Sequence, residues 1–143
     1  ADNEKEHAKR FFSFLDSGEA LEITAAYPAG KTGTTADNLR AAANGENEEW
    51  THLYPAFAET ARKEGFMEAA AAFTLIGKVE KEHEARYRKL LDDVEKDHVF
   101  KKDEAVRWKC DNCGYVHEGT SAPGKCPACL HDRAHFEVAP ANY

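Results

Sequence analysis

The chain lacks long hydrophobic runs, an excess of basic residues and the motifs that direct a protein to a membrane. No apolar stretch approaches the roughly 18 residues that a membrane-spanning helix requires, and the first residues do not form a signal-peptide pattern. The net charge is −7, which leaves no basic surface of the kind that binds DNA or RNA. We therefore expect a cytoplasmic protein whose partners include neither membrane nor nucleic acid.

Cysteine is absent from most of the chain. Two Cys-x-x-Cys pairs lie close together, and their members are Cys110, Cys113, Cys126 and Cys129. This spacing is typical of metal-binding knuckles rather than of a disulfide framework. Two such knuckles can close a tetrahedral site of four sulfurs. Zinc and iron both use this ligand set, and the spacing alone favours zinc because zinc ribbons are commoner.

The length allows one full domain and one small module, since the chain has 143 residues. The composition changes over residues 97–106, where the charged run 101–104 predicts a linker. We therefore predict a helical domain over residues 1–100 and a cysteine-containing domain over residues 101–143.

One tetrapeptide, Glu-Lys-Glu-His, occurs at residues 4–7 and again 76 residues later at residues 80–83. Residues three apart share a face of an α-helix, so the glutamate and histidine of each copy can bind the same cation or adjacent ones. Apolar residues of the surrounding segments fall on that face, which predicts that the ligands point into a core. A buried carboxylate costs several kcal/mol unless a proton, a cation or a metal neutralises it.

A third helical segment contributes two more inward carboxylates. Its apolar stripe runs from Leu39 to Ala61, and Glu46 and Glu49 fall inside it, one turn apart. Ferritin-like di-iron or di-manganese bundles take a glutamate from each of two helices and Glu-x-x-His from each of the other two. The predicted ligands of such a site are Glu4, His7, Glu46, Glu49, Glu80 and His83.

The ferritin-like arrangement requires one helix more than the three that carry these ligands. At the offset of the repeat, the counterpart of Glu46 falls about 30 residues before Ala1. We therefore predict a mainly α fold with a ferritin-like four-helix bundle, whose fourth helix is missing here or is supplied by another chain. A small C-terminal domain of β-structure and cysteine knuckles follows it.

The first helix is expected over Asp2–Asp16, because Ser17 and Gly18 form a stop signal. A long connection over residues 19–33 follows, as suits a crossover between two helix pairs. We expect Ile23 and Tyr27 in this connection to pack over the bundle.

The second long helix should begin at an N-cap formed by Thr34 or Thr35. Pro55 falls inside its pattern, and we expect this proline to kink or locally unwind the helix. The helix should end near residues 63–65, and a third helix should run from Phe66 to Val94 or Lys96.

Together these motifs resemble the rubrerythrin family over essentially the whole chain. The segments that carry the likeness are residues 1–10, 45–50, 79–84 and 108–119. The resemblance implies a bundle with a non-sulfur di-iron site, followed by a rubredoxin-like domain in which four cysteines bind one iron. It therefore favours iron at the cysteine site, where zinc is possible in preparations. Two features depart from the family pattern: the first-helix glutamate and its nearby tyrosine have no counterpart, and Leu130 stands where free-standing rubredoxins usually have glycine.

The resemblance also implies a role for each ligand. Glu4 and Glu80 would bridge the two irons, while Glu46 and His83 would bind the second iron.

Glu49 would bind the first iron in the oxidised state, and His7 would replace it on reduction. This exchange is chemically reasonable because Fe(II) needs less negative charge from its ligands than Fe(III). Tyr54 resembles a family tyrosine that is hydrogen-bonded near the site, so we include it among the candidate catalytic residues.

The activity implied by the resemblance is the reduction of hydrogen peroxide to water at the di-iron site, with electrons delivered through the cysteine-bound iron. A separate NAD(P)H-dependent reductase or a rubredoxin would supply the electrons, because this chain has no dinucleotide-binding fingerprint. We also expect a homo-oligomer, at least a dimer, with helices exchanged between subunits. Two alternatives stay open: a ferroxidase or iron-binding protein with a structural zinc site, and an incomplete chain without turnover.

Overall fold

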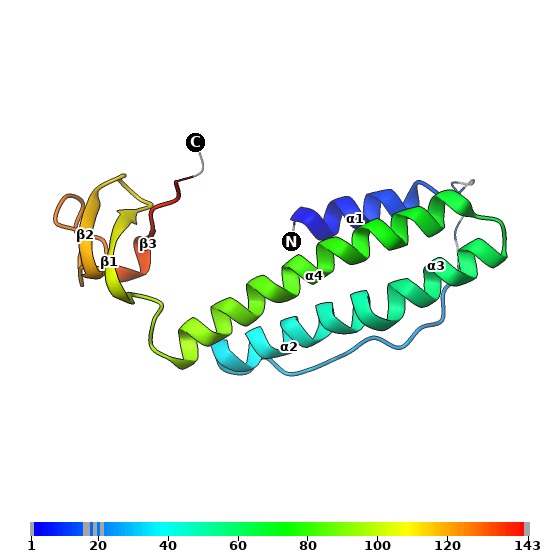
Figure 1. Cartoon of the computed structure of the whole chain (residues 1–143), viewed down its shortest axis with the longest axis horizontal. Coiled ribbons are helices and arrows are strands. Elements are labelled where there is room, and N and C mark those ends of the chain that lie inside the picture. Colours follow the sequence, from blue (N-terminus) through cyan, green and yellow to red (C-terminus); the bar gives the residue numbers. More distant parts are fainter. Residues whose placement is uncertain (1, 16–17, 19, 21, 142–143) are drawn as a thin grey trace. The chain divides into compact units, whose positions relative to one another are not determined.

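The computed structural model describes residues 2–15, 18, 20 and 22–141. The chain divides into two compact units, Ala1–Lys89 and Leu90–Tyr143. The first is helical and the second contains a small antiparallel sheet (Figure 1), which confirms the predicted fold class. Within the part of the chain that is described, no helix has the length and apolar character needed to cross a membrane.

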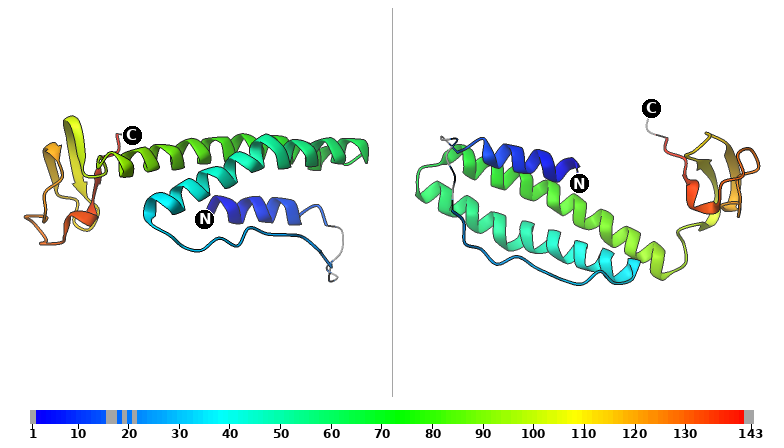
Figure 2. Two further views of the ribbon diagram at one scale, coloured as in Figure 1. Left: turned by 90° about the horizontal axis from the view of Figure 1, so that it is seen from below. Right: turned by 180° about the vertical axis from the view of Figure 1, so that it is seen from behind.

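The helices of this unit form three rods, which lie side by side with their axes roughly aligned (Figure 2). Aromatic side chains join the rods, because Phe11 stacks on Phe73 with ring centroids 4.7 Å apart and contacts Tyr54 at 5.8 Å. The rods are built from α1 (Asp2–Phe12), the run of α2 (Thr35–Glu48), η1 (Glu49–Leu53) and α3 (Tyr54–Lys63), and α4 (Met67–Glu95).

Helix α1 is shorter than predicted, since it ends at Phe12. The Ser13 hydroxyl donates to the Arg10 carbonyl at 2.6 Å, a local bond that competes with the helical ladder. The predicted helix end at Asp16, and Ser17 of the predicted Ser17-Gly18 stop signal, lie outside the described residues. The expectation that Ile23 and Tyr27 pack over the bundle was wrong, because both are largely exposed, at 67% and 77%.

The start of α2 confirms the predicted cap. The Thr34 hydroxyl accepts a hydrogen bond from the Asp37 backbone at 3.2 Å, and the Asp37 carboxylate accepts one from the Thr34 backbone at 3.2 Å. These reciprocal bonds satisfy donors that the first helical turn would otherwise leave unpaired. They fix where the helix begins, and therefore which face carries the glutamates that follow.

Pro55 produces the predicted local unwinding. The five residues of η1 adopt a π-helical turn immediately before the Tyr54-Pro55 pair. Proline has no N–H to donate to the preceding turn, and a wider turn accommodates this gap without breaking the rod. Glu49 is the first residue of the π turn, so the unwinding falls at a predicted ligand.

Helix α4 starts one residue later than predicted, after Gly65 turns the chain at a φ of 89°. Its buried stripe includes Ile76, and Glu80 lies in the middle of the stripe with no exposed surface. Phe66 and Leu90 are apolar but are 62% and 41% exposed. The helix thus buries its carboxylate more completely than several of its apolar residues.

The second unit contains a three-stranded antiparallel sheet in the order β2-β1-β3. Its strands are β1 (Lys101–Cys110), β2 (Val116–Ser121) and β3 (Phe136–Val138). The charged residues 101–104 therefore belong to β1, and the prediction of a linker there was wrong. Lys101 pairs with Ser121, and an irregularity between Lys101 and Val106 lets this polar end join a strand whose other end is core.

The two cysteine knuckles have the same backbone pattern. Gly114 donates to the Cys110 carbonyl at 2.8 Å, and Leu130 donates to the Cys126 carbonyl at 2.9 Å. Both donors have positive φ, 80° for Gly114 and 62° for Leu130. Leu130 therefore adopts the conformation that glycine provides in the first knuckle, at the steric cost of a Cβ atom.

We predict that Leu130→Gly stabilises the second unit by about 1 kcal/mol, because it removes the left-handed strain of a side chain that is 73% exposed. Urea unfolding of the iron-loaded protein, followed by loss of the Fe(III)–thiolate absorption, measures the change. Leu130→Ala is the matched control, since it shortens the side chain but retains Cβ. Equal midpoints for the glycine and alanine variants would show that strain is not the cause.

Candidate metal centres

The helical unit gathers four of the six predicted ligands into one cluster. Glu4, Glu46, Glu80 and His83 each offer a ligand atom, and these atoms lie within 4.8 Å of one another. They come from all three rods. The amphipathic pattern that placed carboxylates in apolar stripes therefore brings them to one point between the rods.

The cluster has two ends, each marked by a histidine. Glu80 faces His7 Nδ1 with one oxygen at 2.9 Å and His83 Nδ1 with the other at 2.7 Å. Glu4 does the same, at 3.1 Å from His7 and 3.2 Å from His83. The two imidazole rings are stacked with centroids 6.0 Å apart. Two carboxylates that each span both histidines form the donor set of a two-ion site.

The surroundings of Glu80 indicate whether a metal ion fits this cluster. Both carboxylate oxygens of Glu80 are buried, and neither forms a hydrogen bond of good geometry with a described residue, although the histidine Nδ1 atoms lie only 2.9 and 2.7 Å away. Leaving such a group unpaired costs several kcal/mol, which a cation between the oxygens and the Nδ1 atoms would offset. Imidazole and carboxylate ligands suit iron, manganese or zinc. The Glu/His group therefore fits a di-iron site.

Burial and mutual repulsion shift the acid–base behaviour of the cluster. Burial, followed by the charges of Glu4 and Glu46, raises the pKa of Glu80 to about 8. Burial, followed by the charges of Glu4 and Glu49, raises the pKa of Glu46 to about 7. Without a metal, the folded chain therefore retains protons here at neutral pH, and metal binding must displace them.

Glu49 lies at the margin of the cluster. Burial and then the charge of Glu4 raise its pKa, while a hydrogen bond from the Tyr54 hydroxyl acts in the opposite direction. The pKa of Tyr54 is also raised, first by burial and then by the charge of Glu49, so the phenol stays protonated and can donate. The structure thus joins the predicted tyrosine to one predicted ligand, Glu49.

Sequence reasoning did not assign a role to Glu84, which is buried one residue after His83. Its carboxylate accepts hydrogen bonds from Trp50 at 2.6 Å, from Asn47 at 3.0 Å and from Arg88 at 2.6 Å. Asn47 and Trp50 directly follow the ligands Glu46 and Glu49 in the chain. The network therefore links the two glutamates of one rod to the Glu-x-x-His motif of another. The only sequence signal for it was the helical i,i+4 pair of Glu84 and Arg88.

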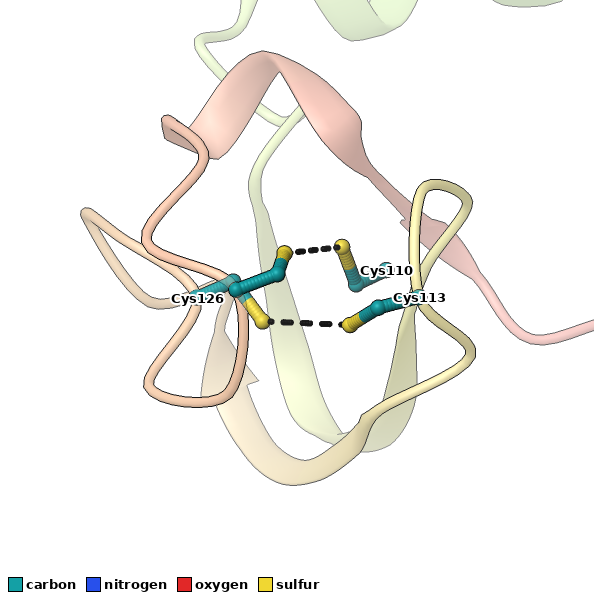
Figure 3. Close-up of side chains that lie close together, drawn as sticks. Cys110, Cys113 and Cys126 are labelled. Carbon is teal, nitrogen blue, oxygen red and sulfur yellow. Dashed lines mark hydrogen bonds between the residues drawn. The ribbon is translucent and has the colours of Figure 1, made fainter.

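The four cysteines converge in the second unit (Figure 3). Cys110 Sγ lies 3.8 Å from Cys129 Sγ, and Cys113 Sγ lies 3.6 Å from Cys126 Sγ. A tetrahedral site with metal–sulfur bonds of about 2.3 Å has sulfur–sulfur edges of about 3.8 Å. These spacings match both observed pairs, so the cluster fits a rubredoxin-like iron site.

The backbone near the second knuckle favours the thiolate form that a metal requires. A hydrogen bond from the His131 backbone is the largest factor that lowers the pKa of Cys129, to about 6. Trp108 packs beside the cluster and donates its indole N–H to the Gly119 carbonyl at 2.9 Å. The site therefore combines polar N–H donors with an apolar wall, the two features that tune metal–thiolate centres.

Comparisons with known proteins agree with both centres. The sequence model of the rubrerythrin family matches residues 1–91, and that of the rubrerythrin rubredoxin-like domain matches residues 108–137. The rubrerythrin of Porphyromonas gingivalis is 62% identical over 143 residues, which are 100% of this chain and 71% of that protein. The rubrerythrin of Nitratidesulfovibrio vulgaris is 50% identical over 143 residues, which are 100% of this chain and 74% of that protein.

A solved structure of nigerythrin in a partially reduced state is also similar. The TM-score is 0.50 at 28% sequence identity, and the match covers 94% of this chain and 62% of that one. The fold and the two ligand clusters define a ferritin-like iron protein joined to a rubredoxin-like domain. This chain belongs to the rubrerythrin family.

The raised pKa of Glu80 predicts how the metal-free chain responds to pH. A carboxyl whose pKa rises on folding stabilises the fold below its unfolded value, and this contribution disappears as the pH rises through the folded value. Between about pH 5 and pH 8.5, Glu80→Gln should therefore gain on the order of 2 kcal/mol relative to the unsubstituted chain. Urea unfolding in the presence of a chelator, followed by circular dichroism of the helices, measures this difference.

The matched control is Glu82→Gln, which changes an exposed glutamate two residues along the same helix. We expect the unfolding free energy of this control to follow that of the unsubstituted chain over the same pH range. A difference between Glu80→Gln and the unsubstituted chain that stays constant with pH would contradict the prediction.

Proposed function

We propose that this protein is a peroxidase that reduces hydrogen peroxide to water at the carboxylate–histidine cluster, with electrons delivered through the cysteine-bound iron. The observation that carries the proposal is Glu80, whose buried oxygens face two histidines without a hydrogen-bond partner. Membership of the rubrerythrin family supports the choice of iron for both clusters. Two irons held by these residues would supply two electrons, as the reduction of one peroxide and the uptake of two protons require.

The geometry supports a bridging role for Glu4 and Glu80, since each of these carboxylates faces both histidines. Glu46 lies nearer the His83 end, with its oxygen 3.6 Å from His83 Nδ1, which favours its assignment to the same ion. Both glutamates with the most strongly raised pKa values would lose their protons to the solvent when metal binds.

We assign Glu49 and His7 to the ion at the other end of the cluster. Glu49 would bind in the oxidised state and His7 in the reduced state, so the net ligand charge changes with the charge of the iron. Tyr54 supports this exchange because its hydroxyl donates to Glu49 and can hold the carboxylate when it leaves the metal. The phenol would also orient a reacting oxygen by donating a hydrogen bond.

The cysteine cluster would relay single electrons. A tetrahedral iron–thiolate centre changes little in geometry between Fe(II) and Fe(III), and its ligands are held by the rigid knuckle bonds. We propose that a separate NAD(P)H-dependent reductase or a rubredoxin reduces this centre. In this scheme residues 1–100 perform the chemistry and residues 101–143 deliver the electrons.

The test uses the full chain loaded with iron and reduced without oxygen. After peroxide is added, we expect the Fe(III)–thiolate absorption to return quickly in the unsubstituted protein. His83→Gln should retain this chromophore but react more slowly, by about 100-fold, because a ligand of the reacting ion is lost. Stopped-flow absorption at equal peroxide concentrations measures both rates, and Glu82→Gln is the matched control.

Two outcomes would overturn the proposal. If dioxygen reoxidised the sample as fast as peroxide and iron then accumulated on the protein, the chain would be a ferroxidase. If His83→Gln reacted with peroxide at the rate of the unsubstituted protein, the cluster would not be the reacting centre.

We also propose that the working form is a homo-oligomer, at least a dimer, in which helices are exchanged. The Glu4 side chain is 47% exposed although its partner Glu80 is fully buried. A groove of about 780 Å³ towards the other end of α1 is lined by Phe14, Phe57, Phe66 and Met67. An added helix would cover both the ligand and this apolar surface.

Size-exclusion chromatography with light scattering tests the assembly. We expect the iron-loaded protein to have at least twice the mass of one chain. A monomer that carries the full complement of iron would contradict helix exchange, without affecting the assignment of the ligands.

A further inference from the structure

A second cleft lies between α3 and α4 in the helical unit, and Tyr54 is the one residue of its lining that the proposed chemistry uses. Its volume is about 410 Å³, which is within the range of small-molecule sites. Aromatic side chains form part of its wall: Trp50, Tyr54 and Phe73. Such rings offer flat apolar surfaces on which another aromatic ring can stack.

The charged residues that line this cleft are all basic. Arg62 lines it from α3, and Lys78 and Lys81 line it from α4. None of its described lining residues is acidic, although the chain as a whole has 26 acidic and 19 basic residues. A local excess of three cations in an acidic protein is a charge pattern complementary to an anion.

One of these cations has a carboxylate within range: the hydrogen bond and charge of Lys63, and less strongly the charge of Arg62, lower the pKa of Glu59. Arg62 donates to the Thr74 hydroxyl at 3.1 Å, a bond that joins α3 to α4 across the cleft. Lys81 Nζ lies 5.3 Å from the centre of the Trp50 ring, within range of a cation–π contact. Among the described residues, no ion pair engages Arg62, Lys78 or Lys81. An arriving anion would therefore compete only with Glu59, whose ion pair at 2.6 Å is with Lys63.

We propose that this cleft binds a small anionic aromatic molecule, an aromatic carboxylate or sulfonate. The ring would stack against Trp50 and Tyr54, and the anion would lie at the rim near Lys78 and Arg62. The basic residues at the rim favour a negatively charged ligand, and the aromatic wall favours a ligand with an aromatic ring. The volume limits it to a molecule of one or two fused or linked rings.

The test compares two fluorescent probes that differ in charge. The first is 8-anilino-1-naphthalenesulfonate, and the second is its neutral analogue N-phenyl-1-naphthylamine. Both are titrated into the full chain, with probe emission and quenching of tryptophan emission as readouts. Lys78→Glu should raise the Kd of the sulfonate at least about fivefold and leave the Kd of the neutral probe nearly unchanged. Added salt should weaken only the sulfonate.

Two variants make the comparison specific. Lys31→Glu is the matched control, because it makes the same charge change at an exposed position outside the cleft and should leave both constants unchanged. Arg62→Glu repeats the substitution from the opposite helix and should weaken the sulfonate as Lys78→Glu does.

Three results would overturn the proposal. The first is equal weakening by Lys78→Glu and Lys31→Glu, which would reveal only a general charge effect. The second is loss of sulfonate binding in Phe66→Ser, which would place the probe in the exposed apolar groove. The third is a sulfonate affinity that falls as the protein self-associates in light scattering, which would make a second copy of the chain the occupant. None of these results affects the assignment of the metal ligands.

Discussion

The structure depends on one buried carboxylate. Glu80 lies in the middle of the longest helix with no surface exposed to solvent and no hydrogen-bond donor of suitable geometry. In a medium of low polarity such a group is tolerated only when protonated or bound to a cation. Its neighbours are three glutamates, whose charges oppose its ionisation, and two histidines, whose Nδ1 atoms face its oxygens. In the absence of metal, Glu80 therefore holds a proton at neutral pH, and two metal ions bound by the cluster would neutralise its carboxylates instead.

The neighbouring Glu84 is a second buried glutamate of α4, and it differs from Glu80 because its carboxylate is fully hydrogen-bonded and joins two helices. Glu84 lies one turn further along α4, is also buried, and accepts hydrogen bonds from three side chains. These bonds, led by those from Asn47 and Trp50, lower its pKa against the effect of burial. A fully satisfied carboxylate beside an unsatisfied one separates the structural network from the metal cluster. The Glu84 network fixes the register between the two helices. That register places the ligands of the metal cluster opposite one another.

The sequence predicted the fold well where the signal was periodic. Glu-x-x-His repeats and paired glutamates lie in helical stripes, and a helix has one geometry, so their convergence could be anticipated from spacing. The burial and contacts of residues outside the stripes could not be predicted in this way. Ile23 and Tyr27 lie in a connection without hydrophobic periodicity, so the sequence did not indicate whether their side chains would contact the bundle. In the structure both are exposed. The charged run at 101–104 joins a strand because pairing with β2 outweighs local composition. Glu84 was missed because its three donors come from two segments whose proximity is a tertiary fact.

The π-helical turn at Glu49–Leu53 has a consequence for the reach of Tyr54. In a regular α-helix, residues five apart point about 140° away from each other around the axis. Widening the turn reduces that angle to roughly 50°, which lets the phenol of Tyr54 meet the carboxylate of Glu49. The wider turn thus keeps two side chains that are five residues apart on the same face of the rod. Deletion of one residue from this turn would restore a regular α-helix with the tyrosine four residues after the glutamate, about 40° away around the axis. The two side chains would stay on one face, so their contact depends on the phenol and the carboxylate themselves.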